Sequence, residues 1–125
     1  MTRALRYCAC VCACAGSACL NAAQPVDWRE ARLIATGPGV KGPWRQNESR
    51  YDYVDDPAVA VQRDGSILVA WGDQAAKDVL LQTLDARDAQ PLARPLNVSR
   101  SGGTFSWLPR IAVAKDSGND VYLVW

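Results

Sequence analysis

The sequence contains no histidine among its 125 residues, and its five cysteines are confined to positions 8, 10, 12, 14 and 19. Without histidine, a Ser-His-Asp triad, a histidine general base and a histidine-ligated zinc site are excluded within these residues. Basic and acidic residues, 14 and 13 in number, are scattered, and the formal net charge is +1. A basic surface of the kind that binds nucleic acid is therefore not expected.

The first 23 residues have the layout of a secretory signal. Arg3 and Arg6 precede an uncharged run of small residues that ends at Ala23. This order matches the basic end, the apolar middle and the small-residue cleavage region of a signal peptide. The sequence therefore predicts an exported protein, periplasmic or secreted, that is cleaved after Ala23.

The cysteines of this segment leave two alternatives open. Residues 16–19, Gly-Ser-Ala-Cys, resemble a lipoprotein box, so Cys19 is a candidate for a lipid anchor. The alternating Cys-x-Cys spacing fits a soft-metal site, but cysteine also serves as a small hydrophobic residue. We favour the second interpretation and expect no cofactor. The sequence from Gln24 onward has no cysteine, so no disulfide framework holds it.

Two later stretches share one pattern. "DPAVAVQRDGSILVAW" (56–71) aligns with "LPRIAVAKDSGNDVYLVW" (108–125), with Pro57 on Pro109 and Trp71 on Trp125. The two tryptophans lie two residues farther apart in the sequence than the two prolines, and a two-residue insertion in the second turn accounts for this difference. Self-similarity with a period of about fifty residues indicates a repeat architecture, and four-stranded propeller blades have a similar period.

Each copy consists of two apolar runs around a turn, which predicts hairpins over 57–71 and 109–125. We expect their turns near Asp64-Gly65 and Ser117-Gly118. "DVLLQTLDARDAQ" and "RPLNVS" follow as the third and fourth strands of the first repeat. The apolar runs do not alternate with polar residues, which predicts strands that are buried on both faces. No segment after the signal predicts a helix.

Residues 51–125 resemble the bacterial sialidase-like propellers that carry Asp-box repeats. Pro57 and Gly65 fall on the family's strand proline and turn glycine, and "TLDARDAQ" (83–90) keeps Asp85 where an Asp box belongs. The resemblance implies an all-β fold, namely the first one and a half to two blades of a six-bladed β-propeller, truncated in its second blade. The expected organisation is a signal peptide (1–23), an N-terminal segment (24–50), a first blade (51–104) and the start of a second blade (105–125).

The same resemblance implies a parent protein that is an exported exo-alpha-sialidase, a glycoside hydrolase acting on sialoglycans. The family's acid/base aspartate lies in the loop after the second strand of the first blade. "GDQAAKD" occupies that loop, so Asp73 and Asp78 are the candidate catalytic residues. The family's first carboxylate-binding arginine belongs two residues before the opening proline, where this sequence has Asp55, and Trp107 in the second repeat. A carboxylate there would repel a sialic acid, which argues against sialidase activity.

The alternative is a non-catalytic propeller module that binds glycan or protein at the cell surface or in the periplasm. Both interpretations allow a glycan or sialoside ligand and expect no nucleic acid, with membrane contact only through the signal or a lipid on Cys19. With one repeat and half of another, the chain alone is expected to be inactive and not to form a stable monomer.

Overall fold

The computed structural model describes residues 27, 28, 30–115 and 120–125. The chain divides into two units, residues 1–30 and 31–125, and every strand found in the described ranges belongs to the second unit. The predicted signal with Cys19 and the second turn at Ser117-Gly118 lie outside the described residues. Within the described ranges, no helix is long and apolar enough to cross a membrane.

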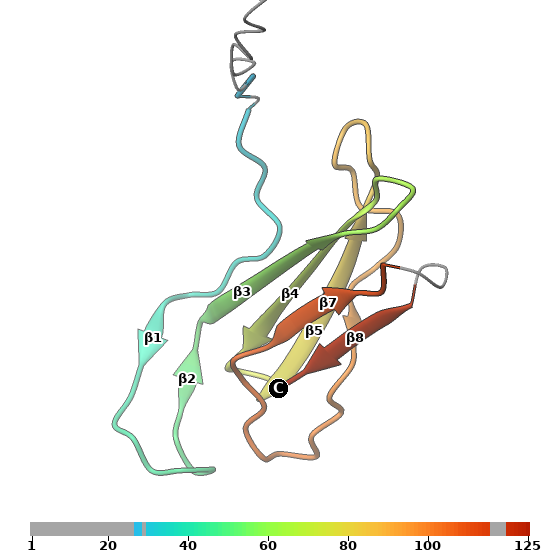
Figure 1. Ribbon diagram of the computed structural model, residues 1–125. Coiled ribbons are helices and arrows are strands. Elements are labelled where there is room, and N and C mark those ends of the chain that lie inside the picture. The colour runs from blue at the N-terminus through green and yellow to red at the C-terminus, as the bar shows by residue number, and fades with distance from the viewer. Residues whose placement is uncertain (1–26, 29, 116–119) are drawn as a thin grey trace, which may run out of the picture. The chain divides into compact units, whose positions relative to one another are not determined.

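The second unit is all-β with antiparallel sheets, as predicted. Two short strands pair first and form an arm, the middle of the chain forms a four-stranded sheet in sequential order, and the last two strands form a hairpin (Figure 1). The strands are β1 (Val40–Lys41), β2 (Tyr51–Asp52), β3 (Val54–Val61), β4 (Ile67–Asp73), β5 (Asp78–Leu84), β6 (Leu96–Asn97), β7 (Arg110–Val113) and β8 (Val121–Val124).

The first predicted hairpin is confirmed as β3–β4, and its turn has the expected chemistry. Gly65 has φ +87°, a conformation that glycine adopts without steric cost. The Asp64 carboxylate accepts hydrogen bonds from the Ser66 backbone N–H (2.9 Å) and hydroxyl (2.7 Å). These bonds, the hydroxyl bond first, hold the pKa of Asp64 below its ordinary value. The turn therefore forms from local interactions.

The third and fourth predicted strands are also present, as β5 and β6. Between them, the Asp85 carboxylate accepts a hydrogen bond from the Arg87 backbone N–H (2.8 Å), and the Ala89 N–H donates to the Asp85 carbonyl (3.0 Å). Asp85 thus fixes a turn through its neighbouring backbone, as short acidic side chains commonly do in turns.

The second predicted hairpin is confirmed as β7–β8, and it repeats the register of the first. In β3–β4, Val59 lies opposite Val69 and Val61 opposite Ile67; in β7–β8 the equivalent residues face each other in the same way. Both copies also begin alike, because the residue before the strand proline has positive φ: Asp56 at 50° and Leu108 at 54°. The internal repeat is therefore a repeat of backbone geometry as well as of sequence.

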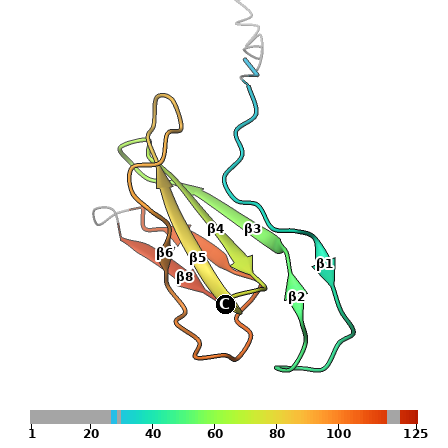
Figure 2. The same ribbon diagram turned by 180° about the vertical axis from the view of Figure 1, so that it is seen from behind.

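The β7–β8 hairpin lies against one face of the four-stranded sheet, with β7 beside β3. It is in front of the sheet in Figure 1 and behind it in Figure 2. We call the covered face the inner face; its residues on the first two strands are Ala58, Ala60, Leu68 and Ala70. Part of the core lies here, since Leu68 and Ala70 are 3% and 0% exposed.

The opposite face, which we call the outer face, corrects one prediction. It carries Pro57, Val59, Val61, Ile67, Val69 and Trp71 on the first two strands, following the pairing registers. Val59 and Val61 are 61% and 60% exposed, so the prediction is wrong for β3. It is confirmed for β4, where Leu68 on one face and Trp71 on the other are 3% and 5% exposed. The uninterrupted apolar run could not reveal this, because burial of a strand face depends on which other segments pack against it.

Candidate functional site

The two predicted catalytic residues lie opposite each other at the β4–β5 turn but have different surroundings. Asp73 is the last residue of β4, and its carboxylate accepts one hydrogen bond, from the Ala76 backbone N–H (3.0 Å). Asp78 is the first residue of β5 and its Cα partner is Asp73. The structure therefore places these two residues as a cross-strand pair at the end of the sheet.

The Asp78 carboxylate holds the chain that follows β6. It accepts hydrogen bonds from Asn97 Nδ2 (2.6 Å), the Ser99 hydroxyl (2.8 Å) and the Ser101 backbone N–H (2.7 Å). Burial raises the pKa of Asp78, but the bonds from Ser101, Ser99 and Asn97 outweigh it and hold the pKa below its ordinary value. A carboxyl that stays ionised and is occupied by three donors is arranged as an anchor and is poorly suited to donate a proton.

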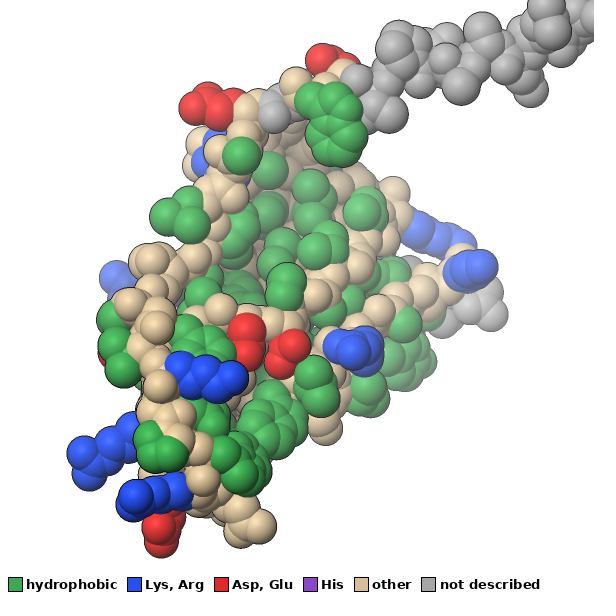
Figure 3. Space-filling model, turned by 90° about the vertical axis from the view of Figure 1, so that its left-hand side faces the viewer, with side chains coloured by type: hydrophobic (Ala, Val, Ile, Leu, Met, Phe, Trp, Pro, Cys, Tyr) green, Lys and Arg blue, Asp and Glu red, His purple; other side chains and the backbone are tan. Residues whose placement is uncertain are grey.

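A groove of about 450 Å³ lies at the same end of the unit, between the β1–β2 arm, the start of β3 and the segment before β7. We call it the aromatic groove. Its lining combines rings with a few polar groups, and consists of Lys41, Trp44, Tyr51, Tyr53, Asp55, Asp56, Gln74, Trp107 and Leu108. Figure 3 shows this side of the molecule, with acidic side chains among hydrophobic and basic ones.

Five rings form a continuous row, and four of them, all except Phe105, line the groove. Trp44 stacks on Trp107 (centroids 5.5 Å apart, planes at 24°), and Trp107 stacks on Phe105 (5.6 Å, 18°). Phe105 meets Tyr51 at 5.7 Å, and Tyr51 meets Tyr53 at 5.5 Å. Offset ring pairs of this kind are favourable beyond their burial of apolar area. The row therefore joins the arm to the segment before β7.

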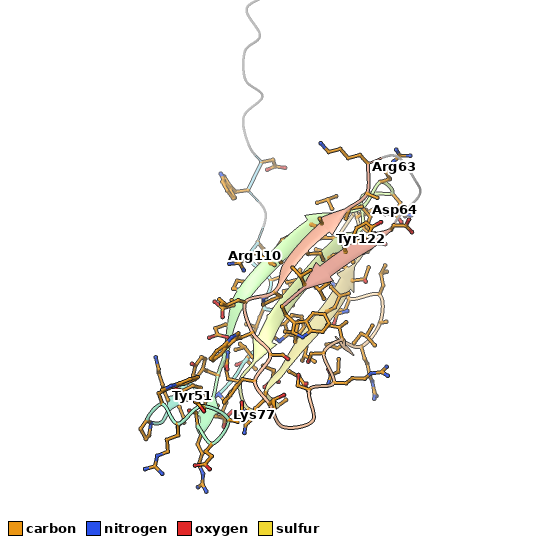
Figure 4. The ribbon with its side chains drawn as sticks, turned by 60° about the horizontal axis from the view of Figure 1, so that its bottom comes forward. Tyr51, Arg63, Asp64, Lys77, Arg110 and Tyr122 are labelled. Carbon is orange, nitrogen blue, oxygen red and sulfur yellow. The ribbon has the colours of Figure 1, made fainter. Side chains whose placement is uncertain are left out.

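Lys77 and Asn47 hold this row in place through Phe105 and its neighbour. The Lys77 ammonium lies 5.1 Å from the centre of the Phe105 ring and donates to the Asn47 carbonyl. The Phe105 backbone N–H donates to Asn47 Oδ1 (3.3 Å), and the Ser106 N–H to the Lys77 carbonyl (3.0 Å). In Figure 4, Tyr51 and Lys77 lie at this end, far from Arg63, Asp64 and Tyr122.

The polar part of the groove is centred on Asp55 and Gln74. Gln74 is only 3% exposed, and its Nε2 donates to Asp55 Oδ1 (2.7 Å). Gly72 leaves room for this pair: a Cβ there would lie 3.1 Å from Asp55 Oδ1 and 3.4 Å from Gln74 Nε2. Gln74 Oε1 is buried with no hydrogen-bond partner within the described ranges. Buried polar atoms are usually satisfied, so an acceptor without a partner here suits a ligand's donor.

Burial also changes the acid–base properties of the groove. It raises the pKa of Asp55; the hydrogen bond from Gln74 offsets part of this rise, and the neighbouring Asp56 adds to it. Burial, with Asp55 next, likewise raises the pKa of the Tyr53 phenol. At neutral pH the groove therefore offers a carboxylate acceptor, a buried amide acceptor and a protonated phenol.

Sequence reasoning misses most of this groove. It singles out Asp55 only because the sialidase-like family is expected to have an arginine at this position, and it does not identify the rings as a site. Tyr51 and Tyr53 are two positions apart, a spacing that points side chains the same way in extended chain. That spacing is the one signal in the sequence that could have found part of the row. The approach of Trp44 to Trp107 depends on contacts between distant segments.

Three arginines that could contact an anionic ligand lie outside the aromatic groove. Arg45 and Arg50 line a separate hollow with Pro43 and Glu48. Arg110 donates to the Pro109 carbonyl (2.8 Å). The described ranges contain no cluster of three or more acidic, cysteine or histidine side chains that could hold a metal ion.

Comparisons with protein-family models, with curated proteins and with solved structures gave no match. The site is therefore interpreted from its own geometry.

Proposed function

We propose that the aromatic groove binds a neutral carbohydrate and that the protein is a non-catalytic glycan-binding module. The observation that carries this proposal is the row of rings beside the Asp55–Gln74 pair. A sugar has apolar C–H faces that pack on aromatic rings, and hydroxyl groups that both donate and accept hydrogen bonds. Binding sites commonly combine an apolar lining with a few placed polar groups in this way.

The charge of the groove supports a neutral ligand. Asp55 and Asp56 both line it, with Lys41 as the one basic residue of the lining. An anionic sugar such as a sialic acid would bring its carboxylate against these two side chains. A neutral sugar has hydroxyl donors for the Asp55 carboxylate and for Gln74 Oε1, which has no partner within the described ranges.

We further propose that the two repeats are blades of a β-propeller of the sialidase-like type, in an exported protein. A four-stranded meander followed by a hairpin of the same register, packed on its face, supports this assignment. Propellers are built by radial repetition of four-stranded sheets. The environment of Asp78 supports binding over hydrolysis, since its carboxylate is already occupied by three donors.

The test is a calorimetric titration of the full chain with neutral gluco-, manno- and N-acetylglucosamine oligosaccharides, and with sialyllactose. We expect a neutral oligosaccharide to bind more tightly than sialyllactose. Trp44→Ala should weaken binding about tenfold, or about 1.4 kcal/mol, because Trp44 is 56% exposed and offers its ring to a ligand.

The matched control is Trp28→Ala. Trp28 is 88% exposed and is not among the residues that line the groove, so this variant should bind like the wild type. Absence of binding to every neutral oligosaccharide would refute the proposal. Equal loss in both tryptophan variants would also refute it, as would release of sialic acid from sialyllactose.

A further inference from the structure

The loop between β1 and β2, at the far end of the arm (Figure 1), has a hollow of its own. This hollow has a volume of about 520 Å³ and is lined by Pro43, Arg45, Glu48 and Arg50. None of these residues lines the aromatic groove. We call it the arginine hollow, because two arginines line one concave surface.

Hydrogen bonds within the loop fix the backbone of both arginines. The Arg45 backbone N–H donates to the Ser49 hydroxyl (2.6 Å), and Ser49 is only 3% exposed. The Glu48 N–H donates to the Arg45 carbonyl (3.0 Å). At the base of the loop the Gly42 N–H donates to the Arg50 carbonyl (3.0 Å), and a Cβ on Gly42 would lie 2.9 Å from that oxygen. The loop therefore holds Arg45 and Arg50 in place relative to each other.

The two arginines are not neutralised by a neighbouring carboxylate. Within the described ranges neither guanidinium forms an ion pair, although Glu48 lines the same hollow. The charged side chains of the lining, two arginines and one glutamate, sum to a charge of +1. Two positive charges held on one short loop repel each other. An anion bound between them would remove this repulsion, and the guanidinium fork matches an oxyanion in both charge and geometry.

We propose that the arginine hollow binds the phosphate or sulfate group of an ester. The terminal oxygens of a tetrahedral oxyanion can accept hydrogen bonds from two guanidinium groups at once, whereas a single guanidinium already occupies both oxygens of a carboxylate. Small-molecule sites have volumes of about 300 to about 1,000 Å³, so this hollow also has room for the atoms that carry the anion. The site does not depend on a ligand in the aromatic groove.

The experiment is an NMR titration of the full, nitrogen-15-labelled chain, in a buffer without phosphate or sulfate. The probes are ethyl phosphate and ethyl sulfate, with propionate as the carboxylate and ethanol as the neutral counterpart. We expect at least one of the two esters to shift the backbone signals of residues 43–50 in a saturable way. Comparison of the two esters shows which group is preferred. Propionate should bind more weakly than the preferred ester, and ethanol should leave these signals unchanged.

Charge variants of the lining should change the affinity for the preferred ester in opposite directions. Arg45→Gln and Arg50→Gln should each weaken binding about fivefold, which is the size of effect typical of an exposed ion pair. Glu48→Gln removes a competing negative charge and should strengthen binding about twofold. The matched control is Arg94→Gln, because Arg94 is also exposed but does not line the hollow. It should bind like the wild type, and circular dichroism should show that all four variants are folded.

Three results would overturn the proposal. If neither ester shifted the signals of residues 43–50, the hollow would not be an anion site. If propionate bound as tightly as both esters, the site would not select a tetrahedral oxyanion. If Arg94→Gln weakened binding as much as Arg45→Gln, the anion would respond to the overall charge of the protein and not to the arginine hollow.

Discussion

Replacing Asp78 with alanine should loosen the segment that follows β6. The carboxylate accepts three hydrogen bonds, from Asn97, Ser99 and the Ser101 N–H. Each bond contributes on the order of 1 kcal/mol at a half-buried position, where solvent weakens charge-assisted bonds. We therefore expect Asp78→Ala to lower the free energy of unfolding by about 3 kcal/mol.

Asp73→Ala is a matched control, because Asp73 is the Cα partner of Asp78 across the same turn and accepts one exposed hydrogen bond. It should cost about 1 kcal/mol or less. The assay is urea unfolding followed by tryptophan fluorescence, at one fixed protein concentration. Equal losses in the two variants, or a loss below about 0.5 kcal/mol in Asp78→Ala, would refute the anchor role.

The same anchor has a defined pH dependence. The pKa of Asp78 is lower in the folded chain than its ordinary value, so its stabilisation is complete above the unfolded pKa of about 3.9. It is lost as the pH falls through the folded value. Asp78→Ala should therefore flatten the acid limb of the stability curve. An unchanged acid limb would contradict this assignment.

Two further predictions concern the aromatic groove. Gly72→Ala should weaken binding of a neutral oligosaccharide in calorimetry, because the new Cβ would lie 3.1 Å from Asp55 Oδ1 and displace the Asp55–Gln74 pair; unchanged affinity would contradict this. The pKa of Asp55 is raised in the folded chain, mainly by burial. Ionisation of Asp55 therefore opposes folding at neutral pH, and the free energy of unfolding should increase as the pH falls through the folded pKa. Asp55→Asn should remove that gain in urea unfolding at pH values from about 7 to about 4, and a gain that persists in this variant would refute the assignment.

Much of the strand structure could be predicted because its determinants are local. The hairpin turn at Asp64-Gly65 depends on one glycine conformation and on bonds within three residues. The alignment of Pro57 with Pro109 also anticipates a common register, since a shared strand–turn–strand pattern constrains which residues pair.

The groove and the burial of individual strand positions could not be predicted in the same way. Trp44 and Trp107 meet because the β1–β2 arm and the segment before β7 come together, and no sequence spacing encodes that contact. Similarly, Val59 and Ile111 are equivalent in pattern, yet one is exposed and the other half-buried. The sequence marks Asp78 only as a loop carboxylate; its three bonds depend on a chain segment about twenty residues away.

The residue before each strand proline, Asp56 or Leu108, has a similar positive φ, so the backbone bends in the same way at both positions. We call each bend, with the residue before it, a corner. Asp55-Asp56 and Trp107-Leu108 occupy equivalent corners of the two repeats, and all four residues line the groove. The same geometry thus presents an acidic pair on one side and an apolar pair on the other. A sugar bound as we propose would place its polar edge on the acidic pair and its apolar face on the apolar pair.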